Sequence, residues 1–148
     1  MLPAPELDRL LSYQNALVIQ QFRKNHPEHA PDAEALFTEM LKYLWLSAQH
    51  QYEQHHSPND PQLDFSPVIH EEMQAIDSMW HEFILVTMDY QHFCQEYFGR
   101  FVHHIPNTDD EIPTEEEYAR ELTLFLEYVL KHLGEETLER WFRADEGF

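Results

Sequence analysis

The thirty residues from 77 to 106 concentrate the side chains of this protein that can do chemistry. The stretch reads DSMWHEFILVTMDYQHFCQEYFGRFVHHIP and contains Asp77, His81, Cys94, His103 and His104. Imidazole, thiolate and carboxylate are ligands of zinc in proteins, and imidazole with carboxylate also suits iron. The same side chains can instead hydrogen-bond to one another and hold a fold together. The stretch therefore predicts either a metal site or a structural motif.

Helical spacing brings two of these side chains together. Asp77 and His81 are four residues apart, so on a helix the carboxylate can accept a hydrogen bond from the imidazole. An acid in this position fixes the tautomer of a histidine for catalysis or for metal binding. The advance of about 100° per residue also places His70 on the same edge of the apolar face of this helix.

A second helix is expected directly after the first, with Cys94 on its inner face and Gly99 as its C-terminal stop. A short break between the two helices folds them into a hairpin. The chain that follows the glycine then brings His103 or His104 back toward His81.

Two interpretations of this cluster stay open. In the first, His81, His104 and Asp77 bind zinc or iron, with Cys94 as a further candidate ligand, and the metal polarises a substrate or a bound water. In the second, the same side chains lock the fold, and the cysteine packs as a small hydrophobic residue. The spacing contains neither CxxC nor HExxH, so it leaves open whether the chain is an enzyme.

Several neighbours of the cluster are expected to be structural. Trp80 and Tyr90 fall on apolar faces and are predicted core residues, and one ring of the His-His pair is expected to hold the exit loop. The residues given this structural role are Trp80, Tyr90, Gly99, His103 and His70. Elsewhere, Glu53 and His56 form one ExxH unit, which di-iron bundles use twice, but the sequence has no second copy with partner glutamates.

Charge and composition narrow the class of protein. The 148 residues are 43% hydrophobic, which is enough for one core and predicts a single domain over residues 1–148 with the motif at 66–106. There is no apolar run long enough for a transmembrane helix and no secretory signal pattern, and one cysteine suits a reducing compartment. These features predict a cytoplasmic protein that binds no membrane.

A formal charge of −19 disfavours nucleic acid, whose phosphates it repels. It fits a solubilising surface, or an acidic face that steers a basic protein partner, as in an immunity or inhibitor protein. The sequence leaves the oligomeric state open.

The elements that must position the motif read as helices. The chain has three glycines, and its prolines lie between segments of helical periodicity, which predicts an all-α, compact bundle of five to six helices. Ser66 with Pro67, and Thr114 with Glu117, are predicted helix starts. The expected helices cover residues 5–25, 32–54, 66–86, 87 or 89 to 98, 114–133 and, after a stop at Gly134, 135–142.

The motif resembles the core of the glycine-rich domain-containing protein-like (GRDP-like) family. That core reads Asp-x-x-Trp-His, then Tyr, Cys, Phe-Gly and a histidine near a proline. Its positions in this chain are Asp77, Trp80, His81, Tyr90, Cys94, Gly99 and His104. The resemblance implies a helical domain. The first hypothesis for the chain is a small acidic binding module of this type, whose Asp-His-Cys-His motif is structural. This chain departs from the family at Phe83, where many members have a second histidine, and it lacks the glycine-rich tail.

Overall fold

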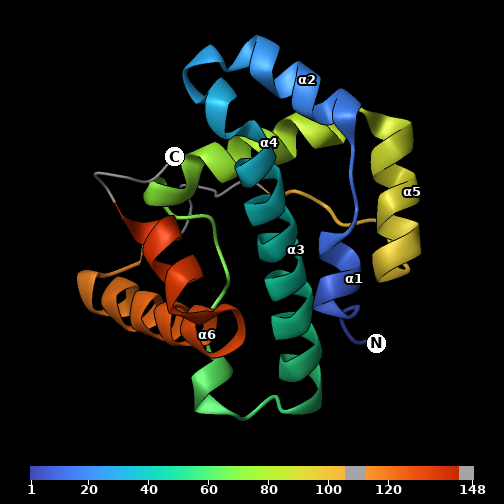
Figure 1. Cartoon of the computed structure of the whole chain (residues 1–148). Coiled ribbons are helices and arrows are strands. Elements are labelled where there is room, and N and C mark those ends of the chain that lie inside the picture. The colour runs from blue at the N-terminus through green and yellow to red at the C-terminus, as the bar shows by residue number, and fades with distance from the viewer. Residues whose placement is uncertain (106–112, 144–148) are drawn as a thin grey trace.

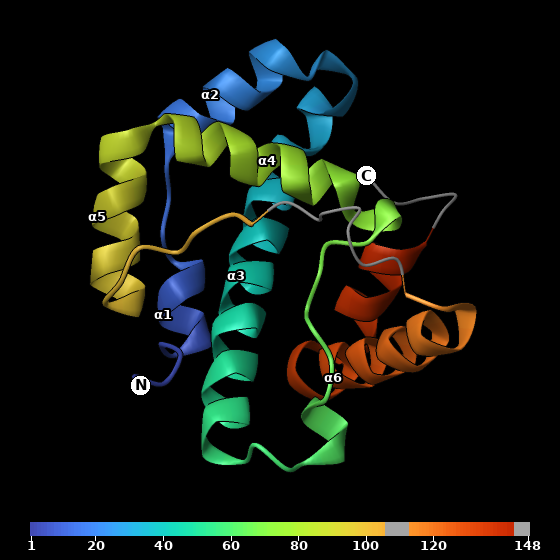
Figure 2. The same cartoon turned by 180° about the vertical axis from the view of Figure 1, so that it is seen from behind.

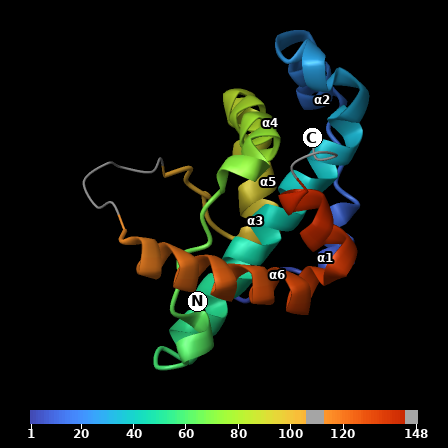
Figure 3. The same cartoon turned by 90° about the vertical axis from the view of Figure 1, so that its left-hand side faces the viewer.

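Helix α3 (Ala33–His56) is the central element, and the other helices pack around it (Figure 1). Its buried residues lie on several sides of the axis, because α4 (Gln74–Leu85) and α6 (Glu115–Phe142) cover it from different directions (Figure 3). The computed structural model describes residues 1–105 and 113–143. Over these residues it contains six α-helices, three short 3-10 turns and no strand, which confirms the all-α bundle.

The first predicted helix is wrong as a single element. It is two helices, α1 (Leu7–Leu11) and α2 (Ala16–Asn25), which are separated by an extended Asn15. The Asn15 side chain accepts a hydrogen bond from the backbone N–H of Val18 at 3.1 Å and caps α2. Its amide nitrogen donates to Asp89 at 3.0 Å. This asparagine therefore fixes the joint against α5, a contact that local periodicity does not reveal.

The predicted helix start at Ser66 is also wrong. Residues 57–70 run as an extended segment with one 3-10 turn, a second 3-10 turn covers Glu71–Met73, and α4 begins at Gln74 and ends at Leu85. The hydroxyl of Tyr43 on α3 donates to the carbonyl of Pro67 at 2.6 Å and holds the segment along α3. Tertiary contact thus overrides a favourable local capping sequence.

The predicted break within the motif is confirmed, but the two helices form a corner (Figure 2) and not the expected hairpin, because the break at Val86 turns the chain without reversing it. Val86 breaks the chain between α4 and α5 (Thr87–Phe98), and Gly99 ends α5 in the left-handed conformation at φ 69°. The segment after Gly99 then crosses back toward α4 (Figure 2). These two breaks bring residues 100–105 to the outer side of α4, where the site lies.

Helix α6 (Glu115–Phe142) follows the predicted capping and kink. The Thr114 hydroxyl accepts a hydrogen bond from the Glu117 N–H at 3.1 Å, and Gly134 interrupts the helix with φ 89° and ψ 171°. The residues after the glycine turn back toward α3 (Figure 1). There the fully buried carboxylate of Glu39 accepts hydrogen bonds from Arg140 at 3.0 Å and from the indole of Trp141 at 2.9 Å.

Among residues 1–105 and 113–143, no helix combines the length and the apolar character needed to cross a bilayer.

Candidate metal centre

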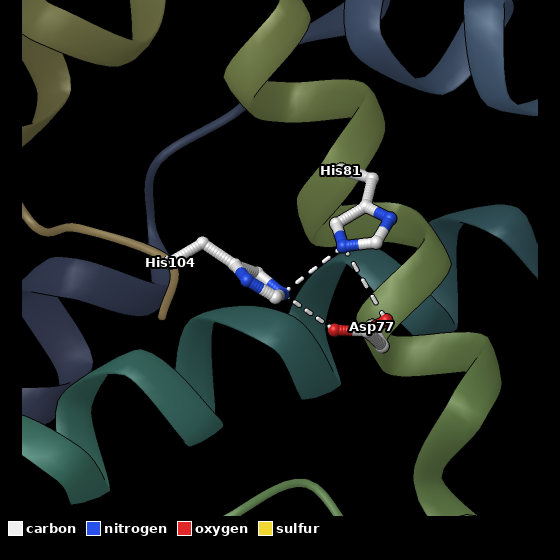
Figure 4. A group of neighbouring side chains, drawn as sticks. All are labelled: Asp77, His81 and His104. Carbon is white, nitrogen blue, oxygen red and sulfur yellow. Dashed lines mark hydrogen bonds and ion pairs between the residues drawn. The ribbon is translucent and has the colours of Figure 1, made fainter. Parts of the chain in front are cut away.

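Three side chains of the motif converge at the outer side of α4 (Figure 4). Asp77 and His81 lie one turn apart on the helix, and His104 reaches them from the segment that follows α5. The Nε2 atom of His104 lies 2.7 Å from Oδ1 of Asp77 and 3.0 Å from Nε2 of His81. The His81 Nε2 atom is 3.4 Å from Oδ2 of the same aspartate. All three residues thus present a ligand atom to one point.

Hydrogen bonds alone satisfy this arrangement poorly. A ring nitrogen offers either one N–H or one lone pair, so Nε2 of His104 can donate to Asp77 or accept from His81 but cannot do both. A cation between the three atoms removes the conflict, because each nitrogen then offers its lone pair. Metal–ligand distances of about 2.0–2.2 Å put neighbouring ligand atoms about 2.8–3.6 Å apart. The two nitrogens are 3.0 Å apart, and each has one oxygen of the Asp77 carboxylate near that range, Oδ1 at 2.7 Å from His104 and Oδ2 at 3.4 Å from His81.

The position of His104 is fixed by the core beneath it. The Trp80 ring lies 4.3 Å from the His104 ring, measured between centroids, and its indole N–H donates to the Tyr90 hydroxyl at 3.0 Å. That hydroxyl donates in turn to the carbonyl of Val102 at 2.5 Å. Trp80 and Tyr90 are both buried, as predicted. Burial raises the pKa of Tyr90, so the phenol stays protonated and keeps its hydrogen bond to the carbonyl.

Cys94 is buried but does not join the three ligand atoms. Its sulfur accepts a hydrogen bond from the N–H of Val102 at 3.5 Å. This contact lies on the core side of residues 100–105, the return segment that follows α5. Burial raises the pKa of the thiol, which disfavours the thiolate that a metal would need. Among the described residues the ligand group consists of Asp77, His81 and His104.

The site lies at the surface instead of in the interior that periodicity suggested. The His81 side chain is 55% exposed, whereas those of Asp77 and His104 are 19% exposed. An open pocket of about 380 Å³ lies against both imidazoles and is also lined by Ile84 and Leu85. Sequence reasoning missed these two residues, although Leu85 lies four positions after His81. The pocket depends on the end of α4 at residue 85, which periodicity locates only approximately.

The remaining predicted residues lie apart from the ligand group. His103 is exposed and packs on Phe101, so His104 is the member of the pair that reaches His81. His70 is not on α4, because its backbone is extended (ψ 164°) and its buried ring packs on Phe125 of α6. Pro106, the last residue of the motif, lies outside the described residues.

The ExxH unit does not form a site of its own. Glu53 points to α6, where its carboxylate contacts the Tyr128 hydroxyl and lies 3.2 Å from Nε2 of His132. The ring of His56 instead packs on Tyr52 at 4.3 Å between centroids. Glu53 therefore takes part in the packing of α3 against α6.

Comparison with known proteins gives one relationship. Searches of the curated proteins and of the solved structures found no match. The resemblance to the GRDP-like family stays a prediction. A family model described as UCP032817-like matches residues 65–139, a stretch that contains the three ligand residues and their supports. Because this match covers slightly more than half of the 148 residues, the chain belongs to the UCP032817-like family.

Proposed function

We propose that this protein binds a divalent metal ion, zinc or iron(II), through His81, His104 and Asp77. The observation that carries the proposal is the position of the His104 Nε2 atom, which is within 3.0 Å of both an imidazole nitrogen and a carboxylate oxygen. One bound cation accounts for both contacts, whereas a single proton makes a well-aligned hydrogen bond to only one of the two atoms.

The ligand set favours a metal that acts on another molecule. Two imidazoles and one carboxylate are used by catalytic zinc sites and by non-haem iron(II) sites, in which the remaining coordination positions are free. A metal held by three protein ligands at an exposed position can polarise a carbonyl group or a bound water. The exposed His81 and the adjacent pocket support access from solvent.

A binding module of the GRDP-like type is the competing function. In that version Asp77 and His104 form a hydrogen-bonded pin that locks the return segment, and the protein acts through its surface. The net charge of −19 supports a basic protein partner, as for an immunity or inhibitor protein. Metal content separates this version from the metal-binding one.

The test is metal stoichiometry on untagged protein. The protein is stripped with a chelator, loaded with zinc or, without oxygen, with iron(II), desalted and measured by elemental analysis. We expect about one metal ion per chain, and a loss of most of it in His81→Gln and in His104→Gln, because each variant removes one of three ligands. The matched control is His103→Gln, which changes the adjacent exposed histidine and should retain the metal.

Two further measurements make the result decisive. The variant His55→Gln/His56→Gln removes the adjacent histidines at the end of α3 and should also retain the metal, which excludes adventitious binding there. If Asp77 and His104 form only a hydrogen-bonded pin, wild-type protein holds no metal, and His104→Gln lowers the melting temperature without any change in metal content. That outcome would contradict the metal-binding function.

A further inference from the structure

We infer that the metal centre takes a small amphiphilic ligand, with a carboxylate or similar anionic oxygen head on the metal and an apolar chain in the pocket beside it. The inference rests on the proposed metal-binding function and adds the chemical class of the molecule bound there. Three observations carry it: the order of residues along α4, the charge at the site, and the lining of the pocket.

The order of residues along α4 gives the ligand a direction of approach. Asp77 lies one turn before His81, and Ile84 and Leu85 lie one turn after it. The pocket borders the two imidazoles and the apolar pair but not the aspartate. A molecule in the pocket therefore reaches the metal from the side away from the carboxylate, where no protein ligand is found among the described residues.

The charge at the site favours an anionic head. A divalent cation with one carboxylate and two neutral imidazoles carries one net positive charge. None of the four pocket residues is acidic, although the chain as a whole carries a formal charge of −19. An anionic oxygen can therefore bind the metal without meeting a carboxylate in the pocket.

The two apolar residues of the pocket favour a ligand whose remaining part is apolar. Ile84 and Leu85 are the two lining residues besides the imidazoles, and Leu85 is 72% exposed although it is large and apolar. The volume of about 380 Å³ is at the lower end of the range of about 300–1,000 Å³ for small-molecule sites. A short hydrocarbon chain on Leu85 gains apolar contact that acetate lacks.

Cobalt(II) gives a direct test, because it binds nitrogen and oxygen ligand sets like that of zinc and its visible bands change when a ligand enters the coordination sphere. Cobalt-loaded protein is titrated with acetate and with octanoate, below the concentration at which octanoate aggregates. We expect octanoate to change the bands at a concentration at least about tenfold lower than acetate, because methylene groups leave water on binding.

Two variants test whether the stronger binding of octanoate comes from contact with the pocket. Leu85→Ser should reduce the advantage of octanoate over acetate at least about threefold, with cobalt affinity unchanged. Met88→Ser is the matched control, since Met88 is 71% exposed, near in sequence and outside the pocket lining, and it should keep the full advantage. Both positions are exposed, so neither change threatens the fold.

The outcomes separate the two proposals. Cobalt bands that acetate and octanoate change equally, or an advantage that Leu85→Ser leaves intact, would overturn the ligand inference alone. Protein that binds no cobalt would overturn the metal-binding function and this inference with it.

Discussion

At the scale of single residues, the hydroxyl of Tyr90 connects the core to the candidate metal centre. It accepts from the indole of Trp80 and donates to the carbonyl of Val102, two residues before His104. The sulfur of Cys94 accepts a hydrogen bond from the N–H of the same valine. The return segment is thus fixed through both backbone polar groups of one residue, so His104 is positioned by residues outside the candidate ligand group.

Replacing Tyr90 by phenylalanine tests this positioning. The change leaves a buried indole N–H and a backbone carbonyl without a partner, so we expect a loss of about 1–3 kcal/mol in the free energy of unfolding. Zinc affinity should fall about 10- to 100-fold, as it does when residues that orient a metal ligand are removed. Urea denaturation of metal-free protein and a competition titration with a zinc chelator measure the two effects.

The matched control is Tyr97→Phe on the same helix, whose hydroxyl has no hydrogen-bond partner among the described side chains and backbone groups. It should leave zinc affinity unchanged. Equal affinities in wild-type protein and Tyr90→Phe would show that the hydroxyl does not position His104.

At the scale of elements, the breaks between helices decide where the site and its supports lie. Val86 sets the corner between α4 and α5, Gly99 ends α5, and Gly134 turns the end of α6 back onto α3. The two glycines differ in conformation. Gly99 is left-handed, whereas Gly134 combines φ 89° with ψ 171°, a region that is essentially restricted to glycine.

Gly134→Ala should lower the free energy of unfolding by about 1–3 kcal/mol through backbone strain alone. An added Cβ at this position meets no atom within 4 Å, so a steric clash does not contribute. Thermal or urea denaturation measures the loss. Glu135→Ala, at the adjacent exposed position, should change stability by no more than about 0.5 kcal/mol, and an equally small effect at Gly134 would contradict the strain.

At the scale of the whole molecule, two buried histidines and one half-buried histidine line the contacts that α6 makes with the rest of the fold. His50 on α3 packs on Tyr128, His132 on α6 packs on Trp45, and His70 packs on Phe125. Burial lowers the pKa of all three. Nearby glutamates oppose this effect, but the loss of solvation is the larger cause.

These histidines should make the protein less stable in acid. A folded-state pKa below the ordinary 6.5 means that the unfolded chain binds more protons between the two values, so stability is lost as the pH falls below about 6.5. Urea denaturation of metal-free protein at pH 7.5 and pH 5.5 measures the loss. His70→Phe keeps an aromatic ring against Phe125 and should reduce the difference between the two pH values.

His103→Gln is the control for this comparison, since it replaces an exposed histidine that packs on Phe101, away from the α6 contacts. It should leave the pH difference unchanged. A difference that is the same in wild-type protein and His70→Phe would show that His70 does not contribute to acid sensitivity.

The features that local chemistry controls could be predicted from the sequence. The all-α class, the break before α5, the glycine stop at Gly99 and the Thr114 cap each depend on residues within one or two helical turns. The pairing of Asp77 with His81 follows from their spacing of four on one helix. These features need no knowledge of what packs against them.

Tertiary packing decided the rest. Because Tyr43 holds the segment before α4 along α3, His70 lies in that segment and not on α4, and its ring packs against α6. Tertiary packing also brought His104 to Asp77 and His81 and kept Cys94 on the core side, because the hydrogen bonds of Val102 set the path of the return segment. Whether a distant residue reaches a site depends on such contacts, which the spacing of residues along the chain does not encode.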